Sequence, residues 1–297
     1  MSLSIQNLTV IIVSYMSDHI IHDCIKSLPN DLKILVVENS NNKIFKESIE
    51  KKYKNIECIL SKQNLGMGVA NNLGLRNIKT DYALILNPDV ILENNSLTKL
   101  IKASEEIDNF GILSPVSKDK NLPNYKIKQN NINYDNFNSP FKVESVDGFA
   151  MLLNVKKINS LENFKNFNFF DENIFLYLEN DDFCKRLIDN NENIYIVPDS
   201  KIKHIGAGSV DKKYSFQIEI SRNWHWIWSK FYFNKKHKGF IFAFLTGFPS
   251  FSSALFKSLI YFFIGNKNKS KIYKYRYLGF INAVMGNKSY LRPEIDV

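Results

Sequence analysis

Short apolar runs alternate with segments of helical periodicity over roughly the first two thirds of the chain. The runs are continuous, which is typical of strands buried on both faces of a sheet. We expect strands at residues 10–15, 33–40, 56–60, 82–90, 111–116, 146–154 and 193–198. Because helices such as the one expected at residues 43–53 separate these strands, the pattern predicts βαβ units and an α/β fold with a mostly parallel sheet.

The fourth apolar run ends abruptly in Asn87-Pro88-Asp89. Pro88 cannot donate a hydrogen bond to a neighbouring strand, so it ends this one. Asp89 is therefore expected at the carboxyl end of a central strand, where open α/β sheets bind their ligands. A carboxylate fixed there is a natural ligand for a hard divalent cation. The alternative is a strand followed by an ordinary turn.

Two further polar groups follow strands in the same half of the chain. Glu38 ends the second strand, and Asn64-Leu65-Gly66 precedes a helix. The backbone N–H groups of such a glycine-bearing turn can bind a phosphate at the start of the helix. The Gly-Lys-Ser/Thr of a P-loop does not follow, and GxGxxG does not follow the first strand, which weakens a dinucleotide-binding interpretation. A turn that only begins a helix is the alternative.

An acidic cluster and one histidine come later in the chain. Glu179, Asp181 and Asp182 lie near the amino end of a predicted helix, where the helix dipole favours negative charge without any further function. The functional alternative is a general base that deprotonates a hydroxyl nucleophile. His204 precedes a Gly-Ala-Gly turn after the last core strand, a place that suits either a structural histidine or a metal ligand.

The character of the sequence changes at Asp211, which divides it into predicted domains at 1–210 and 211–297. The second part is aromatic and basic, and residues 239–265 are nearly all apolar but interrupted by Pro249 and Lys257. The first half of this stretch is too short to cross a bilayer, and its basic flanks predict that both ends stay on the cytoplasmic side. We expect a monotopic helical hairpin or interfacial helices. A helical subdomain packed on the first domain is the alternative.

The composition indicates which partners the protein has and in which compartment it works. The net charge of +9 and the pI near 9.2 indicate an anionic partner: nucleic acid, a nucleotide ligand or an anionic membrane. Carboxylates at the strand ends would face the wrong charge on nucleic acid, so we expect no nucleic-acid partner. The three scattered cysteines argue for a reducing compartment. The polar segment at residues 118–140 has no periodicity and predicts a mobile surface loop, often a lid or binding loop.

The order of seven motifs resembles that of inverting glycosyltransferases of family 2 with the GT-A fold, a family that includes bacterial rhamnosyltransferases of cell-surface polysaccharide assembly. The motifs are VIIVSY, VVENS, NLGMGVANNLG, LNPDV, VDGFAML, FDENIFLYLENDDFCKRL and HIGAGS. The resemblance implies transfer of a sugar, rhamnose among them, from a nucleotide diphosphate sugar to a hydroxyl of a glycan or lipid-linked acceptor. It also implies Mg²⁺ or Mn²⁺. The apolar stretch and its basic flanks predict a place on the cytoplasmic face of the inner or plasma membrane, peripheral or monotopic.

The resemblance assigns roles to individual residues. Those assigned to the sugar-nucleotide donor are Ser14, Tyr15, Glu38, Ser40, Asn64, Gly66, Asn71, Asn87 and Asp89. Asp89 would hold the metal on the donor diphosphate, His204 would be a second metal ligand, and Gly148 would lie under the acceptor.

The sequence departs from the family pattern at two positions. Glu38 stands where the family usually has Asp. The acidic motif Glu-Asp-x-Asp-Leu-Cys reads Glu-Asn-Asp-Asp-Phe-Cys here, at residues 179–184, so Asn180 replaces the carboxylate that often acts as the base. We therefore expect Glu179 as the base, with Asp182 and Asp181 as the next candidates. The same asparagine motivates an alternative of another class, a membrane-tethered nucleotide-sugar-binding protein without catalysis.

Overall fold

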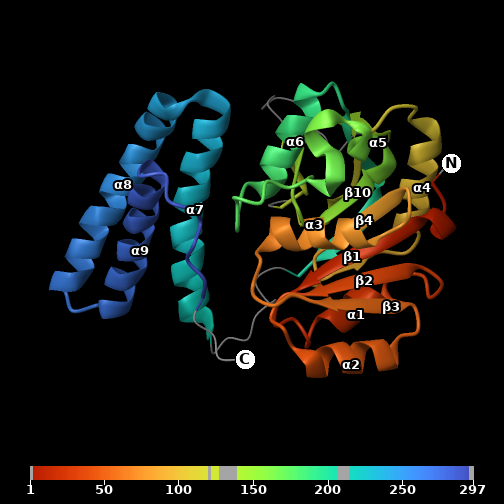
Figure 1. Cartoon of the computed structure of the whole chain (residues 1–297), viewed down its shortest axis with the longest axis horizontal. Coiled ribbons are helices and arrows are strands. Elements are labelled where there is room, and N and C mark those ends of the chain that lie inside the picture. Colours follow the sequence, from red (N-terminus) through yellow and green to blue (C-terminus); the bar gives the residue numbers. More distant parts are fainter. Residues whose placement is uncertain (1–2, 120–121, 127–138, 206–213, 294–297) are drawn as a thin grey trace. The chain divides into compact units, whose positions relative to one another are not determined.

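The computed structural model describes residues 3–119, 122–126, 139–205 and 214–293 (Figure 1). The chain divides into two compact units. The first comprises Met1–Asp171 and Asn180–Val210, and the second comprises Glu172–Glu179 and Asp211–Val297. Each unit has its own hydrophobic core and is described by itself.

The described residues of the first unit form a sheet with the strand order β3-β2-β1-β4-β10-β6-β11-β5, with β8 beside β11. Its strands are β1 (Leu8–Ser14), β2 (Lys33–Glu38), β3 (Ile56–Leu60), β4 (Tyr82–Leu86), β5 (Val90–Leu92), β6 (Ile112–Ser117), β8 (Phe141–Lys142), β10 (Ala150–Asn154) and β11 (Ile194–His204). Strands β3, β2, β1 and β4 are parallel, whereas β10 runs antiparallel between β4 and β6. The mostly parallel sheet predicted from the apolar runs is confirmed.

Helices cover both faces of this sheet, because alternate strand residues point to opposite sides. The helices are α1 (Ile21–Lys26), α2 (Lys43–Lys52), α3 (Met67–Asn77), α4 (Ser96–Glu106), α5 (Val155–Ser160) and α6 (Glu179–Asp189), with short 3₁₀ turns η1 (Ile5–Asn7) and η3 (Glu162–Phe167). Val10 and Ile12 of β1 pack in one cluster with α1, α2 and α4. Ile11, between them, packs in the opposite cluster with α3, α5 and α6.

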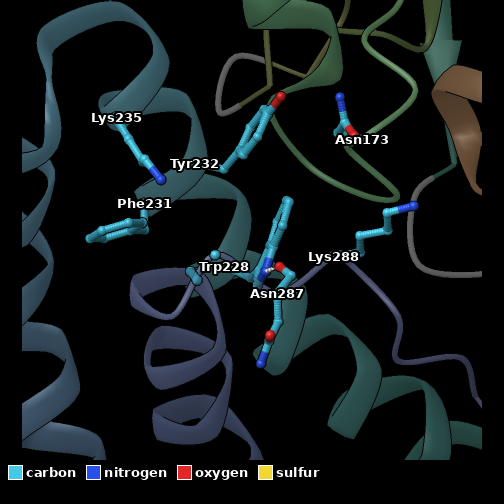
Figure 2. Close-up of a pocket in the computed structure, with 9 residues that line it drawn as sticks. Asn173, Trp228, Phe231, Tyr232, Lys235, Asn287 and Lys288 are labelled. Carbon is cyan, nitrogen blue, oxygen red and sulfur yellow. Dashed lines mark hydrogen bonds between the residues drawn. The ribbon is translucent and has the colours of Figure 1, made fainter.

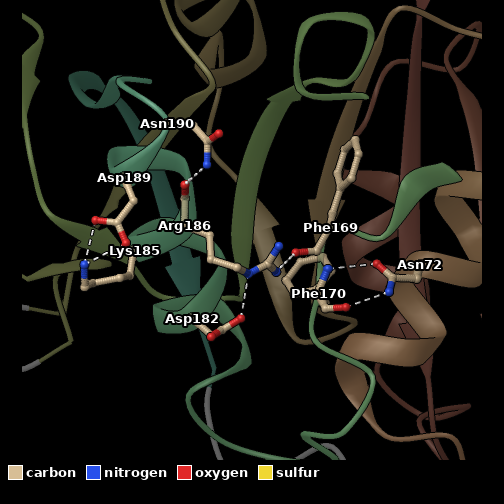
Figure 3. Close-up of polar contacts among 8 residues, drawn as sticks. All are labelled: Asn72, Phe169, Phe170, Asp182, Lys185, Arg186, Asp189 and Asn190. Atoms are coloured by element: carbon tan, nitrogen blue, oxygen red, sulfur yellow. Dashed lines mark hydrogen bonds and ion pairs between the residues drawn. The ribbon is translucent and has the colours of Figure 1, made fainter. Parts of the chain in front are cut away.

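Polar contacts fix the segment that precedes α6 to the rest of the first unit (Figure 3). The Asn72 side chain of α3 donates to the carbonyl of Phe170 at 2.8 Å and accepts from its N–H at 3.0 Å. Arg186 of α6 donates to the carbonyl of Phe169 and to Asp182 Oδ2. Backbone groups that no strand pairs are thereby satisfied by side chains of two helices.

The segment at residues 118–140 was predicted as a loop, and its described part contains a short strand. β7 (Tyr125–Lys126) pairs antiparallel with β9 (Ser145–Val146) in a separate two-stranded sheet. The rest of the predicted loop, at 120–121 and 127–138, lies outside the described residues, as does the Gly-Ala-Gly turn after His204.

The second unit is built on three helices, α7 (Ser215–Lys238), α8 (Phe240–Phe263) and α9 (Lys267–Val284). Their core is aromatic, with Trp224, Trp228 and Phe280 fully enclosed. Glycines let the helices approach closely: a Cβ on Gly279 would overlap the carbonyl oxygen of Trp224, and one on Gly247 would overlap the Phe280 ring. No larger residue fits at either position without displacing a neighbour.

The prediction that Pro249 and Lys257 interrupt the apolar stretch is wrong. Both lie inside α8, which is continuous from Phe240 to Phe263. A proline removes one helical hydrogen bond, and packing against α7 and α9 holds the turns on either side of it. In the described part of the chain, α8 is the helix that is long and apolar enough to cross a membrane, with a mean hydropathy of 1.3, and 17% of its most apolar window is buried.

The residues after α9 are fastened to α7. Trp228 Nε1 donates to the Asn287 carbonyl at 3.1 Å, and Figure 2 shows these two residues beside the pocket that they line. His225, which is fully buried, contacts the Leu291 carbonyl through Nε2 at 2.7 Å and the Ser289 hydroxyl through Nδ1 at 3.0 Å. Burial lowers the pKa of His225 to about 4, so the ring is neutral and donates from Nε2 while Nδ1 accepts.

Because His225 is buried in its neutral form, we expect the second unit to lose stability in mild acid. Below pH 6.5 the unfolded chain binds a proton at His225 that the folded unit does not accept until about pH 4, so the free energy of unfolding falls across that window, by ~3 kcal/mol in full. All three tryptophans of the chain lie on α7, so thermal unfolding followed by tryptophan fluorescence from pH 7 to 4 reports this unit. His225→Gln should flatten the dependence and His237→Gln should keep it; an equal slope in both variants would contradict the assignment.

Candidate functional site

The two residues predicted to share a metal ion lie side by side in the structure. β5 pairs antiparallel with β11, which places His204 opposite Val90, next to Asp89. The Ile205 N–H donates to the Asp89 carbonyl at 3.0 Å, and His204 Nε2 lies 3.4 Å from Asp89 Oδ2. The imidazole stacks on the Phe149 ring at 4.2 Å, which fixes its plane.

A helix supports the turn that carries Asp89. Cys24 Sγ of α1 lies 3.6 Å from the Asn87 carbonyl. Burial, reinforced by the Asp89 charge, raises the pKa of Cys24 to about 12, so the thiol stays protonated and donates to that carbonyl. No pattern in the sequence pointed to this role of Cys24, which is one of the three scattered cysteines.

The Asp89–His204 pair fits a divalent metal. Asp89 and His204 are 6% and 14% exposed, and His204 Nδ1 is buried without a hydrogen-bond partner among the described residues. Carboxylate oxygen and imidazole nitrogen are ligands that Mn²⁺ accepts, and the carboxylate suits Mg²⁺. In the described residues no three His, Cys, Asp or Glu side chains are grouped to hold an ion. The protein would therefore supply two ligands, an arrangement that leaves positions for phosphate oxygens and water.

Other predicted donor residues place unpaired polar atoms at the same edge of the sheet. Ser14 Oγ at the end of β1, Asn87 Oδ1 after the neighbouring β4, and Asn71 Oδ1 on α3 are buried without a hydrogen-bond partner in the part of the chain that the structure describes. Buried polar atoms are nearly always hydrogen-bonded. A site that binds a polar ligand through hydrogen bonds needs such free polar atoms, and three different elements supply them here. Tyr15, the next residue after β1, is half-buried.

Glu38, which was predicted to contact the donor, is hydrogen-bonded to its own loop. Its side chain is fully buried, and its carboxylate accepts from the Ser40 N–H at 2.9 Å, the Ser40 hydroxyl at 2.5 Å and the Asn42 N–H at 3.0 Å. Burial raises the pKa of Glu38, and these donors oppose the rise. Glu38 and Ser40 thus hold the turn after β2 together.

Asn39, which sequence analysis did not single out, shapes the predicted phosphate-binding turn. Its amide donates to Asn64 Oδ1 at 3.1 Å, and its oxygen accepts from the Leu65 N–H at 2.9 Å. Gly66 then donates to Asn64 Oδ1 at 3.0 Å and has a φ of 79°, a left-handed value that favours glycine. The only available signal was the position of Asn39 directly after a strand.

Asp182, one of the predicted candidate bases, is buried and paired inside the first unit. It has no exposed surface, and Arg186 Nε donates to it at 2.8 Å within α6 (Figure 3). Asp181 is more accessible and is held by Lys126 Nζ at 2.7 Å and the Ser145 hydroxyl at 2.6 Å. Glu179, the first residue of α6, is half-buried and grouped with the second unit.

A further carboxylate, Asp147, lies beside the residue predicted under the acceptor. A Cβ on Gly148 would lie 3.5 Å from the Asn180 Cβ, and the Asn180 amide donates to the Val146 carbonyl at 2.7 Å. Burial raises the pKa of Asp147; Asp181 adds to the rise, and Lys126 and His204 oppose it. Only its burial near these charged groups distinguishes Asp147, so the sequence did not reveal it.

Known structures share the fold of this chain. A mannosyltransferase, PcManGT from Pyrobaculum calidifontis in complex with GDP-Man and Mn²⁺, is 12% identical, with a TM-score of 0.55 over 95% of this chain and 88% of that one. S. aureus TarS is 14% identical, with a TM-score of 0.51 over 96% and 93%. GalNAc-T7 with UDP, GalNAc and Mn²⁺ has a TM-score of 0.51 at 14% identity, over 73% of this chain and 50% of that one. The fold is of the GT-A type.

Sequence relatives agree with this fold. The low-salt glycan biosynthesis hexosyltransferase Agl10 of Haloferax volcanii is 23% identical over 214 residues, which are 64% of this chain and 64% of that relative's length. Residues 9–175 match the family described as Glycosyl transferase family 2. That match covers more than half of the chain, and the chain therefore belongs to glycosyl transferase family 2.

Proposed function

We propose that this protein is a metal-dependent inverting glycosyltransferase that moves a sugar, rhamnose among the candidates, from a nucleotide diphosphate sugar to a hydroxyl of a glycan or lipid-linked acceptor. The observation that carries the proposal is the 3.4 Å approach of His204 to Asp89 at the carboxyl edge of the sheet. Family membership supports it, as do the hexosyltransferase relative and the neighbours that hold UDP or GDP-Man with Mn²⁺.

The donor would bind along the carboxyl edge of β1 and β4. Ser14, Asn71 and Asn87 would supply the hydrogen bonds that their buried atoms lack within the described residues. The turn before α3, braced by Asn39, presents a helix amino terminus, where partial positive charge favours a phosphate. Asp89 and His204 would hold Mg²⁺ or Mn²⁺, which when bound neutralises charge on the leaving diphosphate.

The acceptor hydroxyl would be deprotonated by a carboxylate near Gly148. Glu179 remains the proposal from the sequence, and Asp181 and Asp147 lie on the Gly148 side of the first unit. Asp147 directly precedes Gly148, and burial raises its pKa, which suits a carboxylate that has to accept a proton. A single in-line displacement assisted by one such base inverts the anomeric centre.

We also propose that α8 binds the cytoplasmic face of the inner or plasma membrane, as a peripheral or monotopic contact. Large apolar side chains on α8 face outward, with Ile241, Leu245 and Phe263 exposed by 74%, 65% and 81%. The side chains that α8 buries are small: Ala243, Gly247, Ala254 and Ser258. Such small residues permit close helix packing, and outward-facing large ones suit lipid.

Charge supports an anionic membrane as the partner of the second unit. From Asp211 onward the chain has fifteen Lys and Arg residues against four Asp and Glu. Basic residues end α7 and begin α9, on both sides of α8, at Lys235, Lys236, Lys238, Lys267, Lys269 and Lys271. Each basic residue near an anionic surface contributes about 1 kcal/mol, and basic residues at both ends favour keeping both on the cytoplasmic side.

The metal pair predicts the loss of a ligand-dependent stabilisation. A nucleotide sugar with Mn²⁺ should raise the melting temperature of the wild type, and Asp89→Asn or His204→Gln should abolish the Mn²⁺-dependent part and lower transfer about 100-fold or more. Asp199→Asn, an exposed carboxylate of β11, is the matched control and should retain both. If Mn²⁺ still stabilises both site variants, the proposed function is wrong.

The carboxylates should separate into two classes. Asp147→Asn, Asp181→Asn and Glu179→Gln should keep donor affinity, and the one that carries the base should lower kcat about 100-fold or more. Asp182→Asn should instead lower the free energy of unfolding by about 3 kcal/mol, because it removes the negative charge that Arg186 pairs with in a buried place. Tight donor binding with no turnover by the wild type on any lipid-linked acceptor would favour the non-catalytic alternative.

The exposed face of α8 predicts membrane release by surface substitutions. The triple variant Ile241→Gln, Phe256→Gln, Phe263→Gln removes apolar contacts that the folded unit does not use, so it should fold and move from the membrane to the soluble fraction. Ile44→Gln, equally exposed on α2, should leave the distribution unchanged. A wild type that stays monomeric and soluble without detergent or vesicles would rule out the membrane proposal.

A further inference from the structure

A pocket of about 260 Å³ lies between α8 and α9 in the second unit. It is lined by Pro249, Ser250, Ser253, Ala254, Lys257, Tyr273 and Arg276. The helices around it are fastened to each other: Ser258 Oγ donates to the Ser270 carbonyl at 3.1 Å, and Ser270 Oγ donates to the Ser258 carbonyl at 2.9 Å. Tyr261 stacks on Tyr273 at 5.5 Å. The pocket is therefore a fixed feature of the helix pair.

The polar residues of this pocket follow helical spacing. Ser250, Ser253 and Lys257 stand three and four residues apart and share a face of α8. Tyr273 and Arg276 stand three apart on α9. Two hydroxyl-bearing serines, a tyrosine and two cationic side chains are thus gathered at one place on a helix that is otherwise apolar.

The positive charge in the pocket has no protein counter-charge among the residues that line it. Arg276 Nε is buried without a hydrogen-bond partner among the described residues, and Lys257 Nζ lies over the Tyr273 ring, 5.4 Å from its centroid. The acidic residues that the structure describes in this unit are Glu172, Glu179 and Glu219, and none of them lines the pocket. A buried guanidinium atom normally has an acceptor, and no described residue supplies one to Arg276 Nε, so an oxygen-bearing anion from outside the chain would fit here.

We propose that this pocket binds the phosphate group of a membrane lipid. Guanidinium, ammonium and hydroxyl groups together are a typical phosphate-binding set, because the arginine fork donates two hydrogen bonds to phosphate oxygens. The helix that bears the pocket also exposes Phe256 and Ile260 on the turns around Lys257. Those side chains give a lipid tail apolar contacts that inorganic phosphate lacks, so the lipid is the better match. The inference deepens the proposed membrane contact of α8 and rests on it.

Vesicle binding by the full-length protein tests the lipid. Vesicles of phosphatidylcholine with either phosphatidic acid or phosphatidylglycerol, matched in surface potential, separate phosphate recognition from general attraction. The wild type should bind phosphatidic acid vesicles about fivefold more tightly or better, because the phosphomonoester offers more free oxygens to Arg276 and Lys257. The double variant Lys257→Gln, Arg276→Gln should lose this preference.

A matched control separates the pocket from net charge. The double variant Lys267→Gln, Lys274→Gln removes two exposed positive charges of α9 outside the pocket. It should weaken binding to both anionic vesicles equally and keep the preference for phosphatidic acid. A wild type without preference, or a preference that survives in the pocket variant, would overturn the proposal.

A soluble probe keeps the pocket testable if α8 does not bind membranes. Monomeric dodecyl phosphate should raise the melting temperature of the wild type, followed by tryptophan fluorescence, but not that of the pocket variant. If no vesicle binds and dodecyl phosphate still stabilises only the wild type, the membrane contact fails and the phosphate pocket stands. An equal effect from inorganic phosphate would reject a lipid as the source, and no effect from either probe would overturn the site.

Discussion

The pairing of β5 with β11 is the interaction on which the candidate site depends. Asp89 follows β4 and would by itself end in an isolated turn. The antiparallel ladder between Val90–Leu92 and the end of β11 brings His204 to it, and the Ile205 N–H closes on the Asp89 carbonyl. Because backbone hydrogen bonds set this register, a slip of one residue would turn the imidazole to the other face of the sheet and separate the two ligands.

The surrounding residues hold that pair from two directions. Phe149, from the segment before β10, stacks on the imidazole, and the Cys24 thiol supports the Asn87 carbonyl from α1. Asn39 orders the turn before α3 in the same way, through its amide group. At this edge of the sheet, small buried polar side chains thus hold in place the backbone segments that would face a ligand. This pre-organisation reduces the ordering cost of binding.

The sequence was informative where local chemistry decides the structure and misleading where packing decides it. Apolar runs located the strands because continuous hydrophobic runs suit strands covered on both sides, and Pro88 marked where β4 ends. Side-chain direction was not predictable: Glu38 turns toward the N–H groups of its own loop, and Asp182 points inward to Arg186. The i, i+4 spacing of Asp182 and Arg186 was a readable signal of that ion pair. Pro249 was misread because its local cost is offset by contacts from α7 and α9, which lie elsewhere in the sequence.

On α8 the usual relation between the size of a residue and the stability lost when it is mutated is reversed. In a water-soluble core, trimming a large apolar side chain leaves a void and costs stability. On α8 the exposed bulky residues, such as Phe256, do not fill the core, whereas Gly247 leaves no room for even a methyl group against Phe280. Adding one carbon at Gly247 should therefore harm the unit more than removing the whole ring of Phe256. Natural sequences should therefore vary little at the small buried residues of this helix and more at its large exposed ones.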